Sequence, residues 1–305
     1  MTTDAGLGGH VHDALFHCSS DELVTAAISF LREGIELGED PVLACTEANN
    51  QDIAAALGED ARITFLPREE FCRSEPAALD RFRRLFDEKR ALGARRLRLV
   101  GEVLPQPEAT SWREWTRLEA VRNAAFAQLP LWSVCAYDMR ELPDEIVTAG
   151  ELTHPYVRRG ASRIPNPSYV EPGGFLERLA AEDAHPVEAT EPVIAIPDLA
   201  NLQSARDAVR AIIAATNATP SVVENFVLAV NEVVGNAVRH GRPPVSLRLW
   251  VTPNRFVCAV RDTGDGFHDP FAGYYSPTPT ELPEGQFGLW LVRQLTDQLS
   301  TSRTP

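Results

Sequence analysis

Short hydrophobic runs alternate with amphipathic stretches over the first half of the chain. Strands are predicted for the runs Val11–His17, Pro41–Thr46, Arg62–Leu66, Arg96–Val100 and Trp132–Tyr137. Helices are predicted between them, over Ser20–Gly38, Glu47–Leu57, Pro76–Leu92 and Trp112–Leu129. Strands that alternate with helices pair in parallel. We therefore expect residues 1–162 to form a layered α/β domain with a mainly parallel sheet.

The pattern changes between Arg163 and Glu191. Repeated prolines and glycines interrupt this segment, so it is predicted to be a linker with at most one short helix, over Phe175–Ala184. From residue 192 to 305 the order of elements is different. A strand is predicted first, then two helices, an antiparallel pair and a last helix, over Val193–Ile196, Leu202–Thr216, Ser221–His240, Val245–Val251, Arg255–Arg261 and Phe287 to about Leu299. This order predicts an α+β domain with one mixed sheet.

Composition limits the functions that the chain can have. With 43 acidic and 29 basic residues, the net charge of −14 argues against binding to nucleic acid or to an anionic membrane. The five cysteines form no CxxC pair, and neither a secretory segment nor an 18-residue apolar run is present. We expect a cytoplasmic protein with free thiols.

One helix carries a polar strip beside its apolar stripe. In Ser221–His240, the positions of Glu232, Asn236, Arg239 and His240 match the i, i+4, i+7, i+8 spacing of a single helix face. Taken alone, such a strip is also typical of a solvated surface. Only the residues further along the chain distinguish a binding strip from a solvated one.

Two glycine motifs lie C-terminal to the strip. Asp262, Gly264 and Gly266 come directly after a strand, where a carboxylate can accept a hydrogen bond from an amino group and glycines let a ligand approach the backbone. Gly285 and Gly288 open the last helix, whose N-terminus favours an anion. Each motif alone is also an ordinary turn.

In this order, the three features resemble the nucleotide site of the GHKL ATPase superfamily, which includes gyrase, a heat-shock chaperone, histidine kinases and MutL. The resemblance runs from about Pro192 to the end and implies a Bergerat-type α/β sandwich that binds ATP and Mg²⁺. It implies that Asn236 binds Mg²⁺ and that Asp262 holds the adenine amino group. Backbone approach to the nucleotide falls to Gly264, Gly266, Gly285 and Gly288, with Arg239 and His240 near the phosphates.

The residue type at the position of Glu232 distinguishes subgroups of the superfamily. Sensor histidine kinases usually carry asparagine there, whereas a carboxylate suits members that deprotonate a water or a hydroxyl. Val193–His240 is similar to the anti-sigma-factor serine kinases, which implies a protein serine/threonine kinase with Glu232 as its base. An atypical histidine kinase is the further alternative. His154 and His185 are the nearest phosphoacceptor candidates, and the proline after each disfavours a helix there.

Two departures from the family pattern favour a different alternative. Gln286 stands where the family has glycine. The long loop before the last helix is predicted to be a lid, and from His268 to Gln286 it contains no arginine or lysine. Related kinases often place a basic residue on the γ-phosphate. A non-catalytic module that binds a partner under ATP control is therefore an alternative to a kinase.

The N-terminal half resembles the MEDS sensory domain. The resemblance rests on the segments His12–Phe16, Phe30–Gly34, Pro41–Leu43, Gly101–Glu102 and Tyr137–Asp138. It implies that the domain senses a small organic compound. From the residues themselves, His12 and His17 are expected to be strand-end histidines bonded to backbone, and Trp112 and Trp115 to be core or interface residues.

Together these expectations describe a signal-transduction regulator in which a sensory domain controls an ATP-binding module. On the resemblance, its partners are a STAS-type anti-sigma antagonist, a sigma factor or both, in transcription regulation. A second copy of the chain is a further partner left open.

Overall fold

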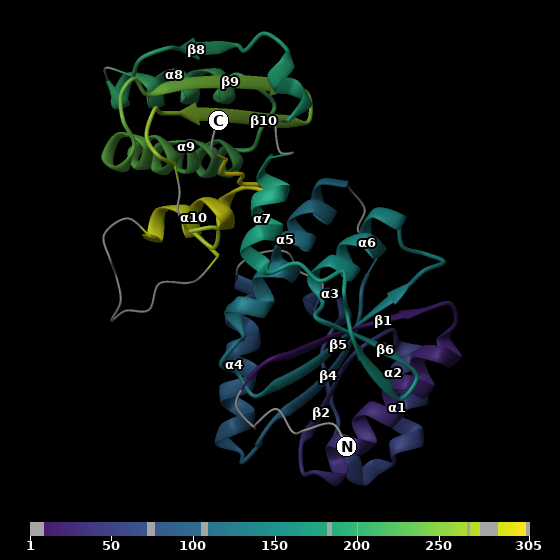
Figure 1. Cartoon of the computed structure of the whole chain (residues 1–305). Helices are drawn as coiled ribbons and strands as arrows, with labels where there is room; N and C mark the ends of the chain where they lie inside the picture. The colour runs from purple at the N-terminus through teal and green to yellow at the C-terminus, as the bar shows by residue number, and fades with distance from the viewer. Residues whose placement is uncertain are drawn as a thin grey trace. The chain divides into compact units, whose positions relative to one another are not determined.

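The computed structural model describes residues 9–71, 77–104, 109–181, 185–199, 201–266, 269–274 and 286–302. Contacts divide the chain into two units, Met1–Leu176 and Glu177–Pro305 (Figure 1). The division falls inside helix α7 (Pro172–Ala181), within the segment expected to be a linker. Each unit is described by itself.

The first unit contains a seven-stranded sheet in the order β3-β2-β4-β5-β1-β6-β7. Its strands are β1 (Val11–His17), β2 (Asp40–Ala44), β3 (Thr64–Phe65), β4 (Leu97–Glu102), β5 (Leu131–Asp138), β6 (Tyr156–Arg159) and β7 (Ser162–Pro165). Neighbouring strands pair in parallel except β6 and β7. The helices are α1 (Ser20–Glu36), α2 (Glu47–Leu57), η1 (Glu59–Ala61), α3 (Arg68–Phe71), α4 (Ala77–Ala91), α5 (Ala109–Ala125) and α6 (Asp144–Thr153). The predicted α/β class is confirmed.

The two faces of this sheet carry different chemistry. Successive side chains of a strand point to opposite faces. Leu15 of β1 and Val134 of β5 pack with Phe30 of α1 and Ile53 of α2 in one hydrophobic cluster. The alternate residues of the same strands, His12 and Cys135 among them, belong to the other face, where α5 and α6 pack together.

A buried carboxylate joins β1 to the edge of the sheet. Asp13 is fully buried and accepts hydrogen bonds from Trp132 Nε1 at 2.9 Å, Arg158 Nη1 at 3.3 Å and Arg163 Nε at 2.9 Å. Arg158 and Arg163 come from the hairpin β6–β7. The sequence pattern did not predict this hairpin, because its arginines are typical of surface residues, and β7 lies at the start of the segment expected to be a linker.

The second unit contains a three-stranded sheet in the order β10-β9-β8. Its strands are β8 (Ile194–Ile196), β9 (Ser246–Thr252) and β10 (Arg255–Arg261), and its helices are η2 (Pro186–Ala189), α8 (Leu202–Ala214), α9 (Pro220–His240) and α10 (Gln286–Leu295). Both strand pairs of the described residues are antiparallel, so the expected mixed sheet is wrong, while the α+β class is confirmed. The last helix also ends earlier than predicted, at Leu295.

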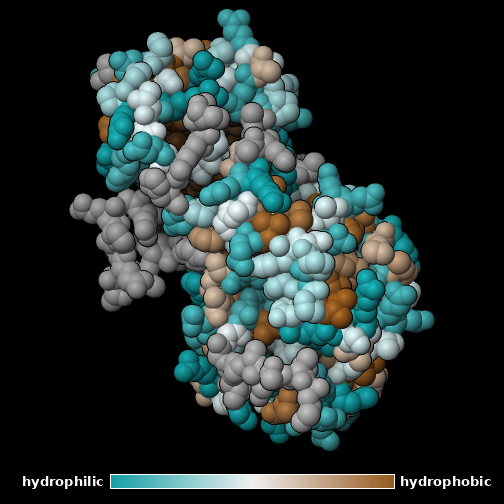
Figure 2. Space-filling model, in the orientation of Figure 1, coloured by the Kyte–Doolittle hydropathy of each residue, from teal (hydrophilic) through white to brown (hydrophobic). Residues whose placement is uncertain are grey.

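The core of the second unit lies between its helices and the sheet. Val209 and Ile213 of α8 pack with the stripe of α9 and with Leu247 and Leu249 of β9. The face of each unit seen in Figure 2 is mostly hydrophilic, with small hydrophobic patches. Among the helices described, none has the length and apolar character needed to cross a membrane.

The network of Asp13 yields a first prediction. Asp13→Ala leaves the buried guanidinium of Arg158 without its carboxylate, so the free energy of unfolding should fall by about 3–5 kcal/mol. The control Asp138→Ala breaks a pair with the exposed Arg140 and should cost much less, because water already screens it. Urea unfolding followed by tryptophan fluorescence compares the two variants. Equal losses would mean that the buried Asp13 pairs contribute no more to stability than an exposed pair.

Candidate functional site

The polar strip of α9 begins with a buried amide. Thr219 caps the helix by accepting a hydrogen bond from Val222 N, and the apolar stripe of α9 faces the core. Asn236 lies on the polar strip and is only 5% exposed. Its Oδ1 accepts a hydrogen bond from Arg239 Nη2 at 3.2 Å. Its Nδ2 is buried and has no hydrogen-bond partner among the described residues.

Helix α10 meets the strip at a glycine. A Cβ added to Gly288 would lie 2.8 Å from Glu232 Oε2 and 3.4 Å from Asn236 Nδ2. The backbone of α10 therefore approaches both polar side chains directly. The structure brings together Glu232, Asn236 and Gly288, which are more than 50 positions apart in the chain at their extremes.

Asp262, which directly follows β10, lies beside the C-terminal end of α9. A Cβ on Gly241 would overlap its carboxyl carbon, and one on Gly264 would lie 2.7 Å from its Oδ1. That oxygen accepts hydrogen bonds from Gly264 N at 2.7 Å and Arg242 N at 3.3 Å. Gly241 comes five residues after Asn236, or roughly 7–8 Å along the helix axis. The carboxylate of Asp262 and the amide of Asn236 are thus spaced along the axis of α9.

The remaining predicted residues lie around these two groups. Arg239 and His240 are in the last turn of α9 and exposed. Gly266 has φ of 72°, a left-handed conformation that favours glycine. Gly285 lies outside the described residues, as does His268.

The described part of the predicted lid is fixed on α10. Gly273 has φ of 79°, and a Cβ there would lie 2.8 Å from the backbone of Leu289. The guanidinium of Arg293 stacks 3.7 Å from the ring centre of Tyr274, and its Nε donates to Ala272 O. Residues 272–274 therefore pack directly against α10.

The first unit corrects one expectation about its histidines. His17 Nδ1 bonds to the backbone oxygen of Ser19 at 3.1 Å, as predicted. His12 does not bond to backbone: its Nδ1 faces Asn123 Oδ1 at 3.0 Å and its Nε2 faces Cys135 Sγ at 3.1 Å. The reason is that His12 points to the sheet face on which α5 packs, where the side chains of Asn123 and Glu119 lie next to its ring.

The aromatic prediction for the same unit is confirmed. Trp112 and Trp115 are 5% and 1% exposed, and their rings meet edge to face. They are core residues rather than the walls of a ligand cage.

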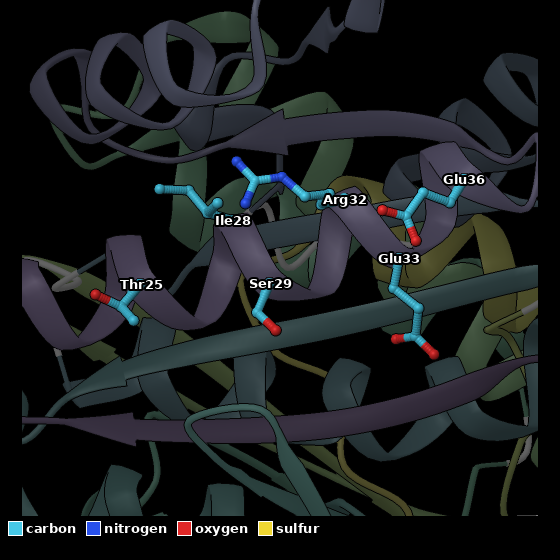
Figure 3. Close-up of a pocket in the computed structure, with 6 residues that line it drawn as sticks. All are labelled: Thr25, Ile28, Ser29, Arg32, Glu33 and Glu36. Atoms are coloured by element: carbon cyan, nitrogen blue, oxygen red, sulfur yellow. The ribbon is translucent and has the colours of Figure 1, made fainter.

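A shallow hollow of about 440 Å³ lies along α1 (Figure 3). It is lined by Thr25, Ile28, Ser29, Arg32, Glu33 and Glu36, all from one helix. Arg32 Nη2 donates to Ala56 O, and Glu33 pairs with the buried Arg98. Two of its charged side chains, Arg32 and Glu33, therefore already stabilise the fold, and none of the site residues discussed above lines the hollow.

Two family models match the chain. The model described as MEDS, the methanogen/methylotroph, DcmR sensory domain, matches residues 11–155. The model described as a histidine kinase-like ATPase domain matches residues 196–305. The resemblances to the MEDS domain and to the histidine kinase-like ATPases are thereby confirmed. Neither a curated protein nor a solved structure matches the chain.

The close packing around Asp262 yields the second prediction. In Gly241→Ala the new methyl group overlaps Asp262 and lies 2.5 Å from Ala237 O, so unfolding should become easier by about 1–3 kcal/mol. Gly235→Ala is the matched control, because its nearest neighbour is Arg239 Nη2 at 3.5 Å. It should stabilise α9 by roughly 0.5–1 kcal/mol. Thermal unfolding of both variants tests this, and effects of the same sign would contradict the packing described.

Proposed function

Because this chain joins a MEDS sensory domain to a histidine kinase-like ATPase domain, we propose that it is a signalling regulator whose second unit binds Mg-ATP and phosphorylates a protein serine. In this proposal the first unit senses a small organic compound. The second unit acts as an anti-sigma-factor type of serine kinase in a partner-switching pathway.

One observation carries the nucleotide part of the proposal. Asn236 is a nearly buried amide whose Nδ2 has no partner among the described residues, and it stands beside Glu232 where α10 offers backbone instead of a side chain. Amide and carboxylate oxygens are ligands that Mg²⁺ accepts. The Oδ1 atom of Asn236 already attracts a cationic group, the guanidinium of Arg239. These residues fit a magnesium nucleotide.

Asp262 fits the base of the nucleotide. It is exposed, and its Oδ1 is the oxygen that accepts the hydrogen bonds from Gly264 N and Arg242 N. Because these bonds use Oδ1, the carboxylate can accept a hydrogen bond from an exocyclic amino group through its other oxygen without disturbing the loop. This supports adenine recognition at the far end of α9.

The chemistry proposed for Glu232 is proton removal. Mg-ATP, when bound, supplies the γ-phosphoryl group with part of its charge neutralised. Glu232 accepts the proton of the partner's serine hydroxyl while that oxygen forms its bond to phosphorus and the bond to the ADP oxygen breaks. Asn236 would hold the metal, and the exposed Arg239 would pair with the phosphates. The proposed protein partners are a STAS-type antagonist and a sigma factor.

A second function, partner binding under ATP control without phosphotransfer, is favoured by one observation. The segment from His268 to Gln286 has no arginine or lysine to place on a transferred phosphoryl group. An atypical histidine kinase is less well supported. His154 is fully buried, so it cannot receive a phosphoryl group, and His185 caps η2 through its Nδ1.

The third prediction tests adenine recognition. Asp262→Asn keeps an oxygen for the loop hydrogen bonds but loses the negative charge, so ATP affinity should fall by about 10- to 100-fold. Asp265→Asn is the control, because Asp265 is exposed and pairs across the surface with Arg242. Calorimetric titration with Mg-ATP measures both. Equal affinity in Asp262→Asn and the unmodified chain would refute the assignment.

The fourth prediction separates binding from chemistry. Glu232→Gln keeps the shape of the side chain and removes the base, so ATP affinity should persist while phosphotransfer falls by roughly 10²–10⁴-fold. Glu224→Gln, an exposed position on the same helix, should change neither. The assay traces label from ATP, with Mg²⁺, onto a serine of a STAS-type protein. Unchanged transfer would exclude Glu232 as the base, and no transfer by the unmodified chain would favour the non-catalytic function.

A further inference from the structure

Four side chains of kinds that bind metals meet inside the first unit, in a cluster that the proposed function does not use. They are His12 on β1, Glu119 on α5, Cys135 on β5 and His154 directly after α6. One atom from each lies within 4.8 Å of the others, and none of the four residues is more than 2% exposed. The cluster lies on the sheet face where α5 and α6 pack together.

The outer nitrogens of both imidazole rings are committed to acceptors. Asn123 Nδ2 donates to Thr153 O at 2.7 Å, which fixes the amide so that its Oδ1 faces His12 Nδ1 at 3.0 Å. His154 Nδ1 lies 2.7 Å from Gly150 O, which can only accept. In the neutral form of each ring, Nδ1 therefore carries the proton and an unprotonated Nε2 faces the cluster.

Inside the cluster, lone pairs face one another. Glu119 Oε1 lies 3.0 Å from His12 Nε2 and 3.3 Å from His154 Nε2, although a carboxylate and an unprotonated nitrogen both only accept. His154 Nε2 has no hydrogen-bond partner within the part of the chain that the structure describes. The thiol of Cys135 has one proton to share, and its Sγ is 3.1 Å from both Glu119 Oε1 and His12 Nε2.

A buried group of acceptors this close needs a cation at its centre. The donor set of two imidazoles, a thiol and a carboxylate indicates the class of cation, because tetrahedral sites of nitrogen and sulfur ligands are typical of zinc.

We propose that His12, Glu119, Cys135 and His154 bind one Zn²⁺ ion. Binding forms a bond between zinc and Cys135 Sγ and releases the thiol proton to water. Tetrahedral bonds of the usual lengths place ligand atoms roughly 3.3–3.8 Å apart. Four of the six separations between ligand atoms are 3.0–3.3 Å and need only small outward movements, and all six lie within 4.8 Å.

The surroundings of the cluster are those of a metal site. Metal-binding histidines usually donate their other nitrogen to an oxygen, as both rings do here, and ligating carboxylates are themselves held. Glu119 Oε2 accepts a hydrogen bond from Arg122 Nη1 at 2.7 Å. The adjoining cavity, which His12 and Cys135 help to line, measures about 10 Å³ and is too small for an organic ligand. The site is therefore closed, and zinc ties β1, β5, α5 and the end of α6 together.

The test measures zinc in the full chain, produced without a metal-affinity tag in zinc-supplemented medium. Elemental analysis should find about one zinc per chain, and the metal-free protein should take up Co²⁺ with the absorption of a tetrahedral thiolate complex. Cys135→Ser should lose the thiolate band. Cys45→Ser is the matched control, because Cys45 is also buried in this unit but lies in the hydrophobic cluster against α1, and it should keep the band.

Other outcomes overturn the proposal. Absence of zinc together with absence of Co²⁺ uptake by the unmodified chain would do so without any substitution. A different metal in place of zinc, or a thiolate band that survives in Cys135→Ser, would also do so. Should Cys135→Ser fail to fold, Asn123→Ala removes the hydrogen-bond partner of His12 Nδ1, together with the bond to Thr153 O, and should weaken zinc binding by about 10- to 100-fold. Unchanged affinity in that variant would contradict the role given to His12.

Discussion

The second unit depends on the close approach of α10 to α9 at Gly288. Any side chain there would displace Glu232 and press on Asn236, so the glycine lets the backbone at a helix N-terminus approach both polar groups. Glycines also allow close packing at the C-terminal end of α9, where Gly241 and Gly264 lie against Asp262. Three glycines thus make room for Glu232 and Asn236 on α9 and for Asp262 beside its C-terminal end. The proposed binding and chemistry both depend on that arrangement.

Much of this arrangement could be predicted from the sequence, because its signals are local. The hydrophobic stripe of α9 fixes which of its faces is buried, and so places Glu232 and Asn236 on the same side. Alternating strands and helices likewise predicted the parallel sheet of the first unit. The contact of Gly288 with α9 joins segments far apart in the chain, so no local pattern predicted it. It was expected only because the order of the motifs resembles that of a known nucleotide site.

What could not be predicted depends on contacts between distant elements. The hairpin β6–β7 has charged strands whose arginines are buried only because Asp13 receives them. His12, Glu119, Cys135 and His154 come from four elements, with no short spacing that marks a metal site. His12 was expected to bond to backbone, but the side chains of α5 that lie against its ring are its partners instead. In each case the partner of a polar residue is set by the order of strands in the sheet.

The central claim, that the polar strip of α9 is a nucleotide site, is tested most directly by hydrogen–deuterium exchange of the full chain with and without Mg-ATP. The nucleotide should slow amide exchange at residues 232–242, 262–266 and 286–293, because these segments form the faces of the site. Exchange in the sheet of the first unit serves as the internal reference. Unchanged exchange in all three segments at saturating Mg-ATP, or protection confined to the first unit, would contradict the account.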